Sequence, residues 1–173
     1  MALNLFQKLD DVIEIIPDGY KIKASAVLDM EELYVEMQRW FTHTGYSWTE
    51  RKYLVSDQPN GSRLHEISWI CTRKVDEYVK YILNVHIKAT ISVVEVSIEQ
   101  SKKNMHKGSI EFRFKGDMIK DVEIWKKKMF GKFLRLIYER VLIKKRLNEY
   151  EDILENESKA LFDEIKEYLG IKE

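Results

Sequence analysis

The stretch from residue 117 to residue 169 constrains the fold most, because it contains almost nothing that would end a helix. After Val122 there is no proline, and Gly131 is the only glycine before Gly170. Apolar residues recur at helical spacing over its first half, which is typical of an amphipathic helix that faces a core. We therefore predict either one very long helix or two helices with a break at 155–158, where Asn and Ser favour helix caps.

The second half of this stretch carries a partial heptad pattern. Leu147, Leu154 and Leu161 fall seven residues apart, a spacing that favours a coiled-coil contact. A continuous helix of this length would be on the order of 70 Å long, so its end must project, fold back or meet a partner. We expect residues 1–148 to form one domain and residues 149–173 to form an acidic helical extension. The three leucines are candidates for a dimer or partner contact.

Charge is segregated along the same stretch. Residues 125–146 hold nine basic residues against one acidic residue, and residues 149–167 hold eight acidic residues against two basic ones. One interpretation is self-complementarity, in an antiparallel dimer or a fold-back. A second is that the apolar half packs on the protein's own sheet and the charges are solvated. A third is a membrane or polyanion surface, whose candidate contacts are Lys126, Lys127, Lys128, Lys132 and Arg135.

Composition narrows the class of protein. A chain of 173 residues is long enough for one domain with a substantial core. Basic and acidic residues are equal in number, which argues against a dedicated nucleic-acid binder. Cys71 is the only cysteine, so no intramolecular disulfide can form, and a cytoplasmic location is expected. No apolar run is long enough to span a membrane, and we expect no signal peptide.

The residues before this stretch predict a sheet with one helix. Residues 12–16 and the alternating segment 20–28 are expected to form a hairpin. Asp29 is a candidate N-cap for an amphipathic helix that ends at Gly45. A polar loop is expected at 101–108. Further strands are predicted, joined by short connections that indicate an antiparallel meander, at residues 46–56, 63–73, 78–88, 91–100 and 109–115.

This order of elements is similar to the helix-grip architecture of START and Bet v 1-like domains, over roughly residues 11–145. The resemblance implies an α+β fold, with an antiparallel sheet of about six strands, one helix after the first strands, and a long C-terminal helix packed on the sheet. It further implies an apolar cavity between the sheet and that helix, suited to a lipid-like or aromatic ligand. Two features depart from the family: only one helix follows the first strands, and the last helix is longer than the sheet needs.

The inward-facing residues of this arrangement are the candidate ligand contacts. His65 shares a strand face with Trp69 and Cys71, so it either lines a cavity or is a core histidine with one hydrogen bond. If Arg73 pairs with Glu77, His65 and His86 lie on opposite faces and cannot form a catalytic or metal-binding pair. The full set of predicted ligand contacts is His65, Trp69, Tyr81, Phe112, Phe114 and Phe133.

The sequence carries no recognisable catalytic or cofactor signature. It contains no metal-ligand spacing, no phosphate-binding glycine loop and no nucleophile motif. The leading hypothesis is therefore a non-catalytic binding module for a small apolar or lipid-like ligand, with no metal and no cofactor. The alternative is an assembly protein that dimerises or recruits a partner through its long helix. Peripheral binding to a membrane or polyanion through residues 125–146 is the third hypothesis.

Overall fold

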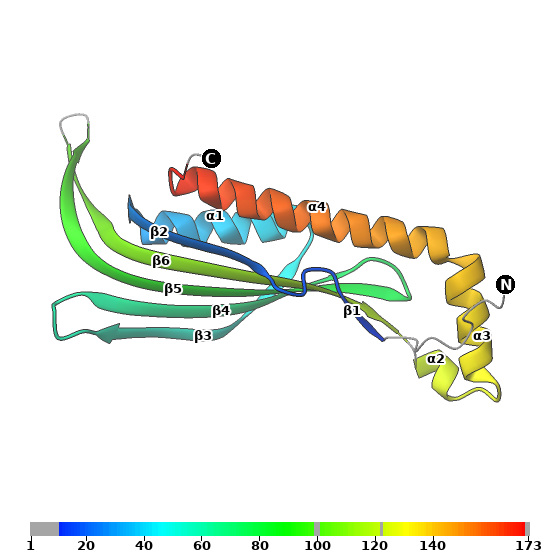
Figure 1. The fold of residues 1–173 in the computed structure, drawn as a ribbon. Helices are drawn as coiled ribbons and strands as arrows, with labels where there is room; N and C mark the ends of the chain where they lie inside the picture. The colour runs from blue at the N-terminus through cyan, green and yellow to red at the C-terminus, as the bar shows by residue number, and fades with distance from the viewer. Residues whose placement is uncertain (1–10, 99–100, 122, 172–173) are drawn as a thin grey trace.

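The computed structural model describes residues 11–98, 101–121 and 123–171. These residues form an antiparallel sheet with helices on one face and at one end (Figure 1), so the predicted α+β class is confirmed. In chain order the elements are β1 (Val12–Glu14), β2 (Tyr20–Leu28), α1 (Met30–His43), β3 (Ser47–Asp57), β4 (Arg63–Lys74), β5 (Val79–Ile98), β6 (Ser101–Lys120), α2 (Glu123–Lys126), α3 (Gly131–Ile137), the π-helix η1 (Tyr138–Leu142) and α4 (Lys144–Tyr168).

The sheet is a meander with an unusual edge. Strands β3, β4, β5 and β6 pair in sequence order, and both β1 and β2 pair with the free edge of β6. Val12 lies opposite Ile119, and Tyr20 lies opposite Phe114, so the two short strands follow one another along one long partner. The predicted hairpin between these two segments is therefore wrong, because β6 is long enough to pair with both.

Strands β5 and β6 form one long hairpin that curls at its far end (Figure 1). Gly108 lies opposite Ile91 in this curl. A Cβ atom on Gly108 would lie 2.0 Å from the carbonyl oxygen of Thr90, so only glycine permits the close approach of the two backbones. The strands predicted at 78–88, 91–100 and 109–115 are confirmed as strand, but the break between the first two and the loop at 101–108 are wrong, because β5 and β6 are each continuous. Residues 99 and 100 of the prediction lie outside the described residues.

Helix α1 matches its prediction closely. The Asp29 side chain accepts hydrogen bonds from the amides of Glu31 and Glu32, which caps the first turn. The backbone leaves the helix through Gly45, in the left-handed region at φ +80°. Helices α1 and α4 lie side by side on the concave face of the sheet (Figure 1), and the core lies between these helices and the strands.

The C-terminal stretch departs from its prediction in where it begins and where it breaks. Strand β6 continues to Lys120, so no helix starts at Asp117. The amide of Ile143 donates to the carbonyl of Tyr138, the five-residue spacing of a π-helix, and the chain bends there into α4. The predicted break at 155–158 is absent, because α4 is continuous through it.

Ser158 shows why α4 does not break at that point. Its side chain is buried, and its hydroxyl oxygen would lie 3.5 Å from a Cβ atom built on Gly116 of β6. Two small residues therefore let the helix lie close to the strand. Ser158, which suggested a helix cap in the sequence, instead makes a packing contact with the strand.

The two halves of the C-terminal stretch have the opposite roles to those predicted from the sequence. We expected the first half to cover the sheet. Instead, α4 covers it through Leu147, Leu154, Leu161 and Ile165. Residues 123–142 extend beyond the end of the sheet (Figure 1).

Candidate functional site

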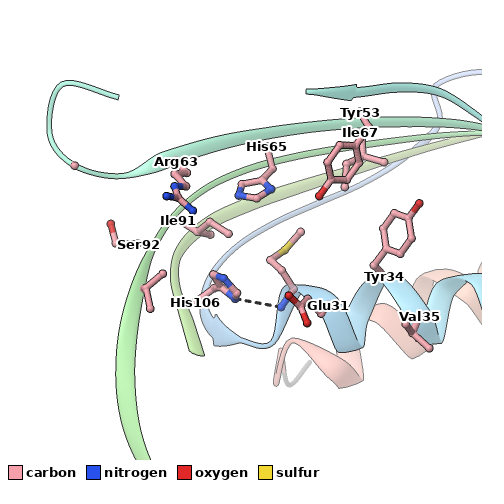
Figure 2. Close-up of a pocket in the computed structure, with 13 residues that line it drawn as sticks. Glu31, Tyr34, Val35, Tyr53, Arg63, His65, Ile67, Ile91, Ser92 and His106 are labelled. Carbon is pink, nitrogen blue, oxygen red and sulfur yellow. Dashed lines mark hydrogen bonds between the residues drawn. The ribbon is translucent and has the colours of Figure 1, made fainter. Parts of the chain in front are cut away.

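An open pocket of about 590 Å³ lies between α1 and the curled part of the sheet. Four consecutive strands and the first turns of α1 contribute to it, so the site depends on the curl of β5 and β6. Figure 2 shows His65, Tyr53 and His106 directed toward a common space. The lining residues are Met30, Glu31, Tyr34, Val35, Tyr53, Gly61, Arg63, His65, Ile67, Ile91, Ser92, Val93 and His106.

A β-bulge places the aromatic side of the pocket. The register of β3 against β4 shifts between Glu50 and Lys52, and an extra residue in one strand reverses its alternation between faces. Glu50 opposes Trp69 before the shift, and Tyr53 opposes Ile67 after it, so both reach the inner face. Without the bulge, Tyr53 would point to the outer face.

Tyr34 of α1 is fixed against this wall. Its ring meets the ring of Tyr53 edge to face at 6.3 Å and that of Trp69 at 4.9 Å. Its hydroxyl donates to Oε2 of Glu50 at 2.7 Å, and the indole nitrogen of Trp69 donates to the same oxygen at 3.3 Å. Burial and the Glu50 carboxylate raise the pKa of Tyr34 to about 12, so it remains a proton donor. The aromatic wall is therefore already ordered without a ligand.

Hydrogen-bond donors gather on the other side. Arg63, His65 and His106 point into the same part of the pocket (Figure 2). Nδ1 of His106 accepts a hydrogen bond of 3.4 Å from the amide of Met30, which leaves its other ring nitrogen as the N–H. Arg63 donates from Nε to the exposed carboxylate of Asp57 at 3.1 Å. This side of the pocket therefore presents Arg63 and two imidazole rings to a ligand, with the Glu31 carboxylate of α1 also in the lining.

Burial lowers the pKa of His65, and the neighbouring His106 and Arg63 lower it further. The ring is therefore neutral near pH 7 and would gain a proton if an anion offset these neighbours. His86 lies on the opposite face of the sheet, where Nδ1 is 2.8 Å from the hydroxyl oxygen of Ser68. The register differs from the predicted one by an even number of residues, so the predicted separation of the two histidines is kept.

The structure brings only one of the predicted ligand contacts into this pocket, namely His65. Four others, Trp69, Tyr81, Phe112 and Phe114, are buried in the core beneath the helices. The Tyr81 hydroxyl donates to the carbonyl of Tyr150 in α4 at 2.6 Å, so α4 lies directly on this part of the sheet. Phe133 lies on α3, beyond the sheet, and is largely exposed.

The predicted partner contacts also lie elsewhere than expected. Leu147, Leu154 and Leu161 are buried in the protein's own core. The rest of α4 is tied to the domain by an ion pair of 2.8 Å between Arg73 and Glu157. A partner could use these leucines only if α4 left the sheet.

The predicted polyanion contacts divide into two groups. Lys126, Lys127, Lys128 and Lys132 are exposed around α2 and α3. Arg135 is buried, and its guanidinium binds the carboxylates of Glu139 and Asp11. Arg135 therefore holds the helices together and is not on the exposed surface.

Sequence reasoning missed most of the pocket for identifiable reasons. His106 fell in a segment expected to be a loop, although stepping back by twos from Ile110 through Gly108 reaches it on the inner face. Arg63 precedes His65 by two residues and so shares its face. Tyr53 could not be placed, because the bulge that turns it inward has no clear signal in the sequence.

The lining residues determine which kinds of ligand the pocket could accept. Among the described residues no group of three His, Cys, Asp or Glu side chains could hold a metal ion. The pocket offers donors, aromatic rings and aliphatic side chains, a combination that suits a ligand with one polar end. Within the described part of the chain, none of the helices is both long and apolar enough to cross a membrane.

No protein-family model, curated protein or solved structure matches this chain at a significant level. The geometry of the pocket therefore carries the functional argument.

Proposed function

We propose that the protein is a non-catalytic binding module that holds a small amphipathic ligand between α1 and the curled sheet. The observation that carries the proposal is the pocket of about 590 Å³, in which three donors face an aromatic and aliphatic wall. This volume lies in the range typical of small-molecule sites. The pocket is next to α1, whereas the helix-grip resemblance implied a cavity beneath the last helix. The concave face of the sheet lies around α4, as the resemblance implies for the last helix. We therefore keep the resemblance as part of the proposal.

The lining suggests the class of ligand. An anionic or strongly accepting group fits the end formed by Arg63, His65 and His106, because each can donate to it. An apolar body fits against Tyr53 and Ile67. A carboxylate with a short alkyl or aromatic body meets both requirements.

The compartment is part of the same proposal. Burial raises the pKa of the Cys71 thiol to about 12, so this cysteine is a structural thiol of low reactivity. A chain with one such cysteine is suited to a reducing compartment, and we propose the cytoplasm.

Native mass spectrometry of the freshly purified protein tests the proposal first, because it detects any ligand that is retained. Titration with decanoate, followed by calorimetry, then tests the ligand class, with decanol as the uncharged control. We expect decanoate to bind more tightly than decanol. Equal affinities, or no binding of either, would contradict the proposed donor site.

Two variants assign the binding to the pocket. Arg63→Gln removes the permanent charge and should weaken decanoate binding by roughly tenfold, the effect of one charge-assisted hydrogen bond. Arg39→Gln is the matched control, because Arg39 is exposed on α1 and pairs with the neighbouring Glu36. Equal losses in both variants would place the ligand elsewhere.

Binding should also depend on pH through His65. Its pKa is lowered in the free protein, and a bound anion would raise it, so binding takes up a proton. Decanoate affinity should therefore increase as the pH falls from about 7.5 to about 5.5, a range in which the carboxylate stays ionised. An NMR titration of the His65 ring, with and without ligand, checks the sign. A pKa unchanged by decanoate would argue against contact with the histidine.

A further inference from the structure

The turn between α2 and α3 forms a basic and apolar tip, which we define as residues 126–134. This segment contains four lysines, four large apolar residues and one glycine, and no acidic residue. Every residue in it except Gly131 is exposed. Figure 1 places this turn at the end of the molecule away from the curl of β5 and β6. The tip is therefore separate from the pocket, and the inference does not rest on the ligand-binding proposal.

The apolar side chains of the tip are exposed to water, and this exposure is energetically unfavourable. Met129 is 83% exposed and Phe130 is 72% exposed. Phe133 and Leu134 follow on the first turn of α3 and are also exposed. A contiguous apolar patch with a polar rim commonly marks a protein or membrane contact.

The backbone holds this arrangement in place. Phe130 has φ +62°, in the left-handed region, and it is the only described residue other than glycine with a positive φ. A bulky side chain is strained there, and such strain tends to persist where function requires it. At Gly131 an added Cβ atom would lie 1.8 Å from the Trp125 carbonyl oxygen, so the tight reversal needs glycine. The turn therefore presents Phe130 at the point of the tip.

The base of the tip is rigid. Arg135 binds Asp11 at 2.6 Å and also Glu139, and Glu139 accepts from Lys120 at 2.7 Å and from Tyr78 at 2.6 Å. These groups are mostly buried and connect α3 and η1 to Lys120 of β6 and to Tyr78, which directly precedes β5. The apolar side chains of the tip thus stay exposed because the segment is anchored through its charges.

We propose that this tip docks the protein on a membrane surface that contains anionic lipids. Lysines beside aromatic and aliphatic side chains match such a surface, since the charges bind headgroups while the apolar side chains enter the interface. Lys127 and Lys132 are exposed on either side of Phe130 in the sequence. Lys126 of the tip pairs with Glu123, and an exposed surface pair of this kind opposes docking little.

A nucleic acid and a second copy of the chain are the two alternative occupants of the tip. A nucleic acid would use the lysines but gains little from Met129 and Leu134, and the chain as a whole carries no excess of positive charge. A second copy offers the acid-rimmed groove between α1 and α4, lined by Glu36, Trp40 and Glu164 among others. Both alternatives are therefore built into the test.

Vesicle co-sedimentation of the full chain tests the proposal. The probes are phosphatidylcholine vesicles with and without phosphatidylserine, at low and high salt. We expect binding to the mixed vesicles only, weakened by salt. Lys127→Gln with Lys132→Gln should weaken binding roughly 30-fold, at about fivefold for each lysine. Phe130→Asn should weaken it by at least about tenfold, since one buried ring is lost.

Matched controls separate docking from folding. Asparagine tolerates the left-handed region, so Phe130→Asn should keep or raise the unfolding midpoint. Ile153→Asn and Lys159→Gln make the same chemical changes at exposed positions of α4 and should leave vesicle binding unchanged.

Several results would overturn the proposal. These are no binding to the mixed vesicles, equal binding to neutral vesicles, and binding that the tip variants do not change. A dimer that the tip variants dissociate, without vesicle binding, would assign the tip to a second copy. Binding to an oligonucleotide that depends on the lysines but not on Phe130, without vesicle binding, would assign it to nucleic acid.

Discussion

Helix α4 and the segment 131–142 are adjacent in the chain, yet they bury opposite kinds of side chain. In α4 the leucines face the sheet and most of the acidic residues face solvent, apart from Glu157, which pairs with Arg73. In residues 131–142 the charged Arg135 and Glu139 are buried, at 8% and 5% exposure, while Val141 and Leu142 are exposed. Similar helical periodicity in sequence therefore led to two opposite orientations. The difference shows that a set of buried ion pairs can decide which face of a helix turns inward. We refer to the side chains of Lys120, Arg135 and Glu139 as the ion-pair ring.

The largest expected effect comes from breaking that ring. Glu139→Ala leaves Lys120 and Arg135 buried without their shared carboxylate, which should lower the free energy of unfolding by about 3–5 kcal/mol. Glu164→Ala removes an exposed carboxylate of α4 and should change it by less than about 0.5 kcal/mol. Urea unfolding followed by circular dichroism measures both. Similar values for the two variants would mean that the ring does not anchor the segment.

Acid should weaken the same ring. Burial by itself raises the pKa of Glu139, but hydrogen bonds from Lys120, Tyr78 and Arg135 outweigh it, so the pKa is lowered. A lowered pKa in the folded state means that its stabilisation is complete above about pH 4.5 and is lost as the pH falls through the folded value. Glu139→Gln should therefore flatten the loss of stability in acid. Parallel profiles of denaturation midpoint against pH would contradict this assignment.

The next effect tests the apolar side of the comparison. Leu154→Ala opens a cavity under α4 and should cost about 2–5 kcal/mol, because this side chain is fully buried. Leu142→Ala, at an exposed position, should cost less than about 0.5 kcal/mol. The same denaturation assay measures the two variants. A larger cost at Leu142 would show that the segment packs against something that the single chain does not contain.

A smaller effect concerns the close contact of α4 with β6. Ser158→Leu forces a larger side chain against Gly116 and should cost about 1–3 kcal/mol through overpacking. Lys159→Leu, one position along on the exposed side, serves as the control and should be nearly neutral. Thermal unfolding measures both variants. If Ser158→Leu stabilised the protein, the contact would be looser than the structure indicates.

The smallest expected effect concerns the strained turn. Phe130→Gly relieves the left-handed strain and should leave stability unchanged or raise it by up to about 1 kcal/mol. Phe133→Gly changes the same residue type at a helical position and should instead cost about 1 kcal/mol. Differential scanning fluorimetry resolves the sign. A loss of stability in both variants would mean that Phe130 packs in the free protein.

The parts of the fold that sequence predicted well are those with a clear period and a clear cap. Helix α1 has both, and the α+β class follows from the strands that alternate. The β5–β6 hairpin was divided because none of residues 92–96 and 103–105, in the described part of its far end, is buried, so no period reveals an inner face. The end of β6 at Lys120 was not predicted from the sequence. A lysine is normally interpreted as exposed to solvent, and the partner that allows this one to be buried, Glu139, lies far along the chain.

The candidate site was less predictable because it depends on three-dimensional shifts of register. His65 was identified from its strand face alone. His106 required knowing that β6 begins at Ser101, and Tyr53 required knowing of the bulge after Glu50. The assumption that a long apolar period must cover the sheet also placed Phe133 in the site, since periodicity does not say which face turns inward.

The position of α4 after all six strands in the chain order has a consequence for biosynthesis. The Tyr168 hydroxyl donates to the carbonyl of Asp29 at 3.1 Å, across 139 residues of sequence. Leu161 and Ile165 complete the core beside strands made much earlier. The part of the concave face that lies under α4 therefore stays uncovered until residues 144–168 have left the ribosome. Nascent chains that stall before α4 should be strong clients of chaperones that bind exposed aromatic surfaces.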